Sequence, residues 1–119
     1  MSELTQIAIS SEPLGADGAL VAVAGELDIA TADPLRDALA QAVADGARRL
    51  VVDLRDVGFL DSVAVAVLVH ASRRVDGRFA VAIEPGSYVR MIFEIAGLLD
   101  GLGVRESLDE ALARVAVAG

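Results

Sequence analysis

The chain has 119 residues, which is the size of one domain, and 55% of them are hydrophobic, so a mainly disordered chain is excluded. The sequence contains no cysteine, no lysine and a single histidine, His70, which excludes disulfides, zinc–thiolate sites, lysine-dependent catalysis and a histidine-rich metal site. The formal net charge of −8 disfavours nucleic acids and anionic membranes as partners and makes a basic protein surface the better electrostatic match.

The sequence does not predict membrane insertion or export. Its longest apolar run, residues 63–69, is far shorter than the roughly 20 residues that cross a bilayer. The N-terminal segment lacks the basic and apolar regions of a secretory signal peptide. We therefore expect a cytoplasmic protein.

The first part of the chain predicts a hairpin followed by a helix. Residues 7–10 and 19–24 have the composition of strands, and residues 12–18 between them are rich in turn-forming residues. We therefore expect a hairpin with a fairly long loop. Thr31 is the predicted N-cap of a helix that repeats apolar residues at intervals of three and four and ends at residues 45–46.

The middle of the chain predicts two buried strands with a helix between them. Residues 49–54 and 79–83 have the apolar character of strands covered on both faces, and residues 55–58 are predicted to turn the chain. The intervening segment alternates large and small apolar residues, which is typical of a strand. Two consecutive parallel strands, however, need a crossover of a dozen or more residues, usually a helix. We therefore predict a helix from Ser62, an acceptable N-cap, to Val75.

The last part of the chain predicts two further helices. Ser87 caps the first, which ends at Gly97, and a capping box that starts at Ser107 opens the second. Residues 102–105 are expected to add a short edge strand. Together the elements predict a single α/β domain over residues 1–119, in which about four helices cover one mixed sheet of four or five strands.

Two segments connect a predicted strand end to a predicted helix start and hold the candidate functional residues. They are residues 25–28, with the sequence GELD, and residues 51–62, with the sequence VVDLRDVGFLDS. Open α/β sheets place their functional loops at this edge. The structural alternative is that Ser62 is an ordinary N-cap and that Asp28 and Asp61 only shape the turns before the two helices.

The residues at these positions do not predict an enzyme. Asp53, near the end of a strand, is similar to the phosphate-accepting aspartate of receiver domains, but those domains also need a lysine, which the chain lacks. Ser62 and His70 are eight residues apart on one predicted helix, so they cannot form a nucleophile–base pair. No GxSxG motif is present for a serine nucleophile. We therefore predict no catalytic residue, no metal site and no cofactor.

The order of these motifs resembles the STAS domain, and within it the bacterial anti-sigma-factor antagonists. GELD is followed by an amphipathic helix, then by VVDLRDVGFLDS, a second helix, and Ala-Gly-Leu at residues 96–98. The resemblance covers about residues 25–112, which is most of the chain. It implies the STAS fold and a regulatory protein that controls sigma-dependent transcription, for example in a stress response.

The resemblance also implies a specific switch. In the family, a partner anti-sigma factor that is a serine kinase of the GHKL type phosphorylates the serine after the aspartate, which abolishes binding, and a phosphatase restores it. The matching serine here is Ser62. The implied partner-binding residues are Asp28, Asp61, Ser62 and Val63.

The chain departs from the family motif DSSGLG directly after Ser62. Val63 replaces the second hydroxyl, and Ala64 and Ala66 replace the two glycines, so the surface that a kinase would contact is altered. Stressosome scaffold proteins of the same superfamily also lack the full motif, and the histidine after Leu68 and Val69 resembles STAS subunits of ABC-type lipid transporters. These two roles are the alternative functions. A nucleotide-binding module is a third, but the chain has no glycine-rich phosphate loop.

Overall fold

The computed structural model describes residues 7–116 and contains one sheet of five strands in the order β1-β2-β3-β4-β5. Only β1 and β2 pair antiparallel, and every other neighbouring pair is parallel. The elements in chain order are β1 (Ile7–Leu14), β2 (Gly18–Leu27), α1 (Ala32–Ala44), β3 (Arg49–Leu60), α2 (Ser62–Arg74), β4 (Phe79–Ala82), α3 (Tyr88–Ile95), β5 (Val104–Arg105) and α4 (Leu108–Arg114). The predicted α/β fold, a mixed sheet with four helices, is confirmed.

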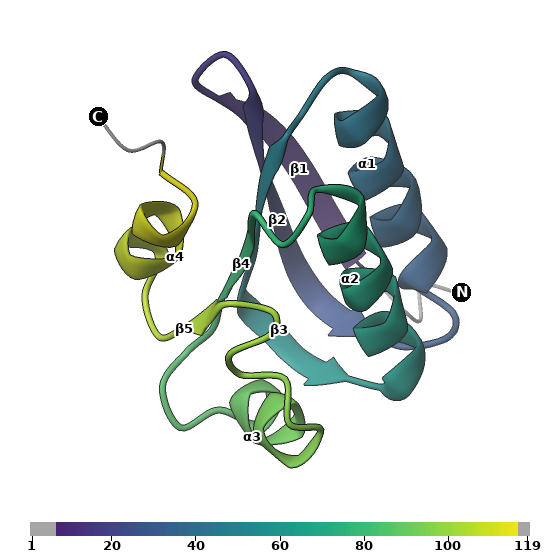
Figure 1. Ribbon diagram of the computed structural model, residues 1–119. Helices are drawn as coiled ribbons and strands as arrows, with labels where there is room; N and C mark the ends of the chain where they lie inside the picture. The colour runs from purple at the N-terminus through teal and green to yellow at the C-terminus, as the bar shows by residue number, and fades with distance from the viewer. Residues whose placement is uncertain (1–6, 117–119) are drawn as a thin grey trace.

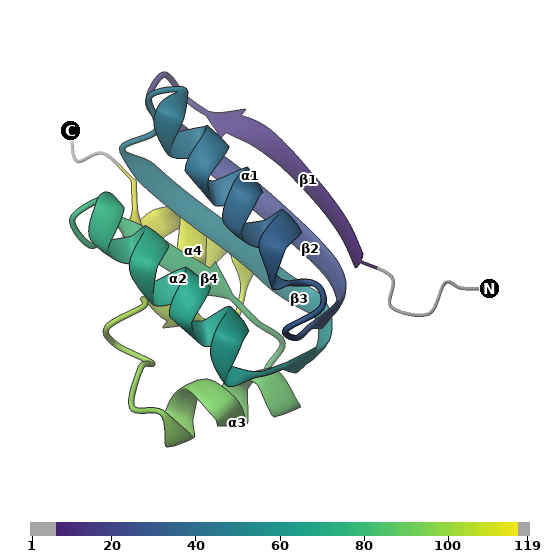
Figure 2. The same cartoon turned by 90° about the vertical axis from the view of Figure 1, so that its right-hand side faces the viewer.

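The helices are divided between the two faces of the sheet (Figure 1, Figure 2). α1 and α2 lie side by side over one face, α4 lies over the other, and α3 lies against β3 at one end of the sheet. The main core joins the α1–α2 side of the sheet to Leu35 and Leu68, and a smaller cluster packs Val51 against Ala111 of α4. Both faces of β3 and β4 are therefore covered, as their apolar sequences predict.

The segment with the ambiguous alternation is a helix, as the crossover argument predicts. β3 and β4 pair in parallel, so the chain between them must return to the starting edge of the sheet. Ala64, Val67, Leu68 and Ala71 are buried on the sheet side of α2, whereas Ala66 and His70 are exposed. One face of α2 is therefore buried against the core, and the opposite face is exposed.

β3 is longer than predicted, and the expected turn at residues 55–58 is wrong. Pairing between β2 and β3 continues to Leu27 and Leu60, with two register shifts along the way. At each shift β3 carries one residue more than β2, which is the property of a β-bulge. Val57 and Leu60 are 6% and 1% exposed, so burying them against the core keeps this polar stretch in the sheet.

The hairpin loop is also shorter than predicted. β1 runs to Leu14 and β2 begins at Gly18, so residues 15–17 alone connect them. Pro13 is tolerated in β1 because this strand lies at the edge of the sheet and one side of it needs no donor. Gly15, at φ +63°, supplies the left-handed residue that the tight connection requires.

One arginine ties this hairpin to the far end of the chain. Arg49, at the start of β3, hydrogen-bonds the Asp17 carboxylate at 2.9 Å, the Leu14 carbonyl at 2.9 Å and the Val115 carbonyl at 3.1 Å. Its side chain is only 12% exposed. The contact therefore joins β1, β3 and the end of α4 through one largely buried guanidinium.

Candidate functional site

The two candidate segments meet at one edge of the sheet. Leu27 and Leu60 are paired at the carboxyl ends of the parallel strands β2 and β3, so Asp28 and Asp61 follow side by side. The backbone N–H of Asp61 donates to the Leu27 carbonyl at 3.0 Å. The structure thus brings together two acidic residues that are 33 positions apart in the chain (61 − 28).

Asp28 organises the loop before α1. Its Oδ1 accepts hydrogen bonds from the N–H groups of Ala30 at 2.9 Å and Thr31 at 3.1 Å. Thr31 occupies the predicted N-cap position but makes no side-chain capping bond. Its buried hydroxyl instead donates to the Glu26 carbonyl at 2.7 Å and accepts from the Asp28 N–H at 2.9 Å. This network fixes the loop, and Ile29 at its tip is 76% exposed.

Asp61, and not Ser62, caps α2, so the N-cap predicted from the sequence is wrong by one residue. The Asp61 Oδ1 accepts from the N–H groups of Val63 at 3.0 Å and Ala64 at 3.1 Å, and its backbone is extended, as an N-cap requires. A carboxylate at this position satisfies two of the unpaired donors of the first turn and faces the positive end of the helix dipole.

Ser62 consequently has no capping role. It is the first residue of α2, it is exposed, and its hydroxyl makes no hydrogen bond with any atom of residues 7–116. Val63, the next residue, is half-buried. The alternative in which Ser62 is an ordinary N-cap is therefore excluded, because Asp61 holds that position.

Apolar side chains are exposed beside this edge, and the sequence predictions missed them. Tyr88, Met91 and Ile95 on α3 are 44%, 43% and 75% exposed. The Tyr88 ring stacks on Phe59, three residues before Ser62, with ring centroids 5.8 Å apart and planes 11° from parallel. The stack fixes the start of α3 next to the end of β3.

The spacing of these α3 residues could have been found in the sequence. Residues 88, 91 and 95 recur at intervals of three and four, so they share one face of the helix. Val89 and Phe93, which are buried, form the other apolar face of the same short helix. Only one of these two apolar faces packs against the core, and an exposed apolar face of this kind indicates a contact surface.

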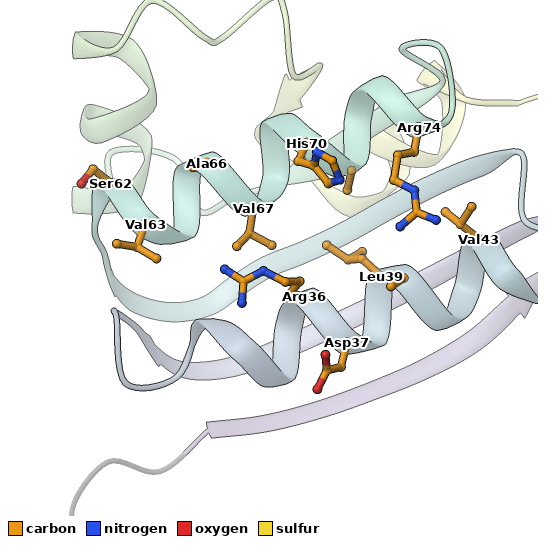
Figure 3. Close-up of a pocket in the computed structure, with 12 residues that line it drawn as sticks. Arg36, Asp37, Leu39, Val43, Ser62, Val63, Ala66, Val67, His70 and Arg74 are labelled. Carbon is orange, nitrogen blue, oxygen red and sulfur yellow. The ribbon is translucent and has the colours of Figure 1, made fainter.

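The two enzyme-like alternatives do not gain support from the geometry. Asp53 lies within β3, paired with Ala22 and Ala82, and not at the strand end where a receiver domain needs its acceptor. Partial burial opposes its ionisation, but two hydrogen bonds from the Arg55 guanidinium at 2.9 Å hold the pKa of Asp53 below its ordinary value. Ser62 and His70 lie at separate points along α2, as Figure 3 shows.

Among residues 7–116, no three histidine, aspartate or glutamate side chains are grouped in a way that could hold a metal ion. In the same part of the chain, no helix has the length and apolar character needed to cross a membrane.

Known proteins are similar to this chain in sequence and in fold. The protein-family model that describes the STAS domain matches residues 12–111. The anti-sigma-F factor antagonist RsfB of Mycobacterium tuberculosis is 33% identical over 99 residues, which are 82% of this chain and 80% of RsfB.

Solved structures agree with the sequence matches. The crystal structure of an anti-sigma factor antagonist from Mycobacterium paratuberculosis has a TM-score of 0.84 and 30% identity, and the alignment covers 97% of this chain and 98% of that one. The unphosphorylated form of the anti-sigma factor antagonist SpoIIAA has a TM-score of 0.74 at 22% identity, covering 93% of this chain and all of that one, which shows the same fold.

Proposed function

The chain belongs to the STAS domain family, and we propose that it is an anti-sigma-factor antagonist whose binding is switched off by phosphorylation of Ser62. The observation that carries the proposal is the exposed Ser62 hydroxyl, which makes no hydrogen bond within residues 7–116 because Asp61 caps α2. A residue that does not cap the helix can be modified without removing the cap. The names of the similar antagonists support the same function.

We propose that the partner contacts the edge formed by Asp28, Asp61, Ser62 and Val63, together with Ile29 at the tip of the neighbouring loop. This edge combines two carboxylates with exposed or half-buried apolar side chains. The stacked Phe59–Tyr88 pair extends the apolar part toward Met91 and Ile95 on α3. A partner that fits this surface presents basic and apolar groups, in keeping with the net charge of −8.

Phosphorylation would act on the interface and not on the fold. The start of a helix tolerates a phosphate, because the positive end of the helix dipole favours negative charge. Two unit charges about 5 Å apart repel by roughly 1 kcal/mol in water and by roughly 3 kcal/mol at the lower dielectric of a covered site. A phosphate adds about 1.5 to 2 negative charges beside Asp61. Covering the site with a partner would then cost about 3 kcal/mol more, which weakens binding more than a hundredfold.

The proposed partner is an anti-sigma factor of the GHKL serine-kinase type, which transfers the γ-phosphate of ATP to the Ser62 hydroxyl. A phosphatase reverses the modification. In this scheme the chain itself acts by binding and catalyses nothing, and its role in transcription requires a cytoplasmic location.

The test is to incubate the chain with a kinase-type anti-sigma factor from the same genome and ATP, and to locate phosphate by mass spectrometry. We expect one phosphate, on Ser62, and none on a Ser62→Ala variant that still binds the unmodified partner. A Ser62→Asp variant should bind at least tenfold more weakly in calorimetry. Ser10→Asp is the matched control, since it adds the same charge at an exposed position on β1.

Two outcomes would refute the proposal. One is phosphate on another residue or on none, and the other is Ser62→Asp binding as tightly as wild type. Co-purification with the ATPase subunit of a lipid transporter, or in a large scaffold assembly, would instead support one of the two alternative functions.

A further inference from the structure

A groove runs between α1 and α2 on the outside of the molecule (Figure 3). Its volume is about 570 Å³, within the range of roughly 300 to 1,000 Å³ that small-molecule sites have. Leu39 and Val43 of α1 and Val63 and Val67 of α2 form its apolar walls, and Ser62 lies at one end. Most of the lining residues are apolar, which indicates a ligand with an apolar body.

Two arginines and one carboxylate line this groove, although the chain as a whole is acidic. The arginines are Arg36 and Arg74, the carboxylate is Asp37, and His70 adds an imidazole that can form hydrogen bonds. In Figure 3 the Asp37 side chain points away from α2, whereas Arg74 reaches from α2 toward α1. The groove therefore presents positive charge to whatever enters it.

Arg74 is the cation best placed to bind an anion. Arg36 already pairs with Asp33 within α1, but Arg74 has no carboxylate within ion-pair distance among residues 7–116. His70 lies one turn before Arg74 on α2, so the two side chains lie over the same side of the helix. An anionic group at this end of the groove can meet both.

We propose that the groove binds a small organic anion with an apolar body, of the class of medium-chain carboxylates. The carboxylate lies at Arg74 and His70, and the chain extends over Val67 and Val63 toward Ser62. A nucleotide fits less well, because the walls are the sides of two helices, whose backbone N–H groups are already used, and offer no cradle for phosphates.

The groove and the proposed partner surface share Ser62 and Val63, so the site bears on the proposed function. A ligand that fills the groove to its end covers these two residues. If the proposed function holds, the same ligand competes with the partner and slows phosphorylation of Ser62. The binding site itself does not depend on that function.

The experiment titrates the isotope-labelled chain with sodium decanoate, below the concentration at which it forms micelles, and follows backbone amide signals by NMR. We expect shifts confined to the α1–α2 groove. Decanol tests the apolar body without charge, acetate tests the charge without the body, and decyltrimethylammonium tests the opposite charge. Each should bind at least tenfold more weakly than decanoate.

Three variants make the assignment specific. Arg74→Gln should raise the dissociation constant about tenfold, as expected for the loss of a charge-assisted contact. Arg73→Gln is the matched control, because Arg73 is exposed on the same helix turn but does not line the groove. Ala66→Phe places a ring in the groove from an exposed position and should abolish binding.

Decanol binding as tightly as decanoate, or Arg74→Gln binding as tightly as wild type, would overturn the inference. So would shifts that map outside the groove. The titration uses the chain alone, so its failure leaves the phosphorylation of Ser62 untouched. Conversely, absence of phosphate on Ser62 would leave a measured decanoate site intact.

Discussion

Replacing Asp61 with alanine tests the capping geometry on which the proposed function depends. The change removes the acceptor for the N–H groups of Val63 and Ala64, which lie 3.0 and 3.1 Å from Oδ1. Loss of such a cap costs about 1 kcal/mol, and loss of the negative charge at the helix start costs roughly 0.5 kcal/mol more. We therefore expect the free energy of unfolding to fall by about 1 to 2 kcal/mol, or the melting temperature by roughly 5 to 10 °C.

Three companion variants separate the cap from the charge. Asp61→Asn keeps an oxygen acceptor, so it should lose less than about 1 kcal/mol. Ser62→Ala should change stability by less than about 0.5 kcal/mol, because its hydroxyl caps nothing. Asp56→Ala removes the same charge from an exposed position on β3 and is the control. Urea unfolding followed by circular dichroism measures all four. Equal losses in Asp61→Ala and Asp61→Asn, or a large loss in Ser62→Ala, would refute the capping argument.

Further predictions address the fold, the partner surface and acid stability. Arg49→Ala should lower the free energy of unfolding by about 3 kcal/mol, since three acceptors lose a largely buried donor, and a change below 1 kcal/mol in urea would contradict this. Ile95→Asp should weaken partner binding at least tenfold in calorimetry without loss of stability, whereas Ala113→Asp, an exposed control on α4, should not. The Arg55 partnership lowers the folded-state pKa of Asp53, so its stabilisation is present above the unfolded pKa of about 3.9 and is lost as the pH falls through the folded value. Asp53→Asn should therefore flatten the dependence of unfolding free energy on pH below about 4, and an unchanged acid transition would argue against the pairing.

The parts of the fold that rest on topology could be predicted from the sequence. α2 is the clearest case, because its valine-rich alternation favours a strand and only the need to connect parallel strands makes it a helix. The caps at Ser87 and Ser107 were also predictable, and both accept a hydrogen bond from the N–H three residues later, at 3.1 Å. Chain connectivity determines the helix in the first case, and the side-chain chemistry of serine determines the two caps.

The errors arise where two local signals compete or where pairing overrides them. Asp61 and Ser62 are adjacent and are both favoured N-cap residues, so sequence alone does not decide between them. Residues 55–58 have turn-like composition, but pairing with β2 and the burial of Val57 keep them in β3. The exposed apolar face of α3 was not predicted, because the buried face that contains Phe93 has the same helical spacing and already accounts for a core contact.

Asp61 caps α2 and Ser62 does not, and this has a consequence for protein abundance. In cells, a loss of 1 to 2 kcal/mol of stability changes the amount of a protein several-fold, because the unfolded fraction is degraded. Since the cap belongs to Asp61, the proposed phosphorylation of Ser62 should leave α2 capped. Under the proposed function, loss of the helix cap would then not be a route by which phosphorylation changes the amount of the protein.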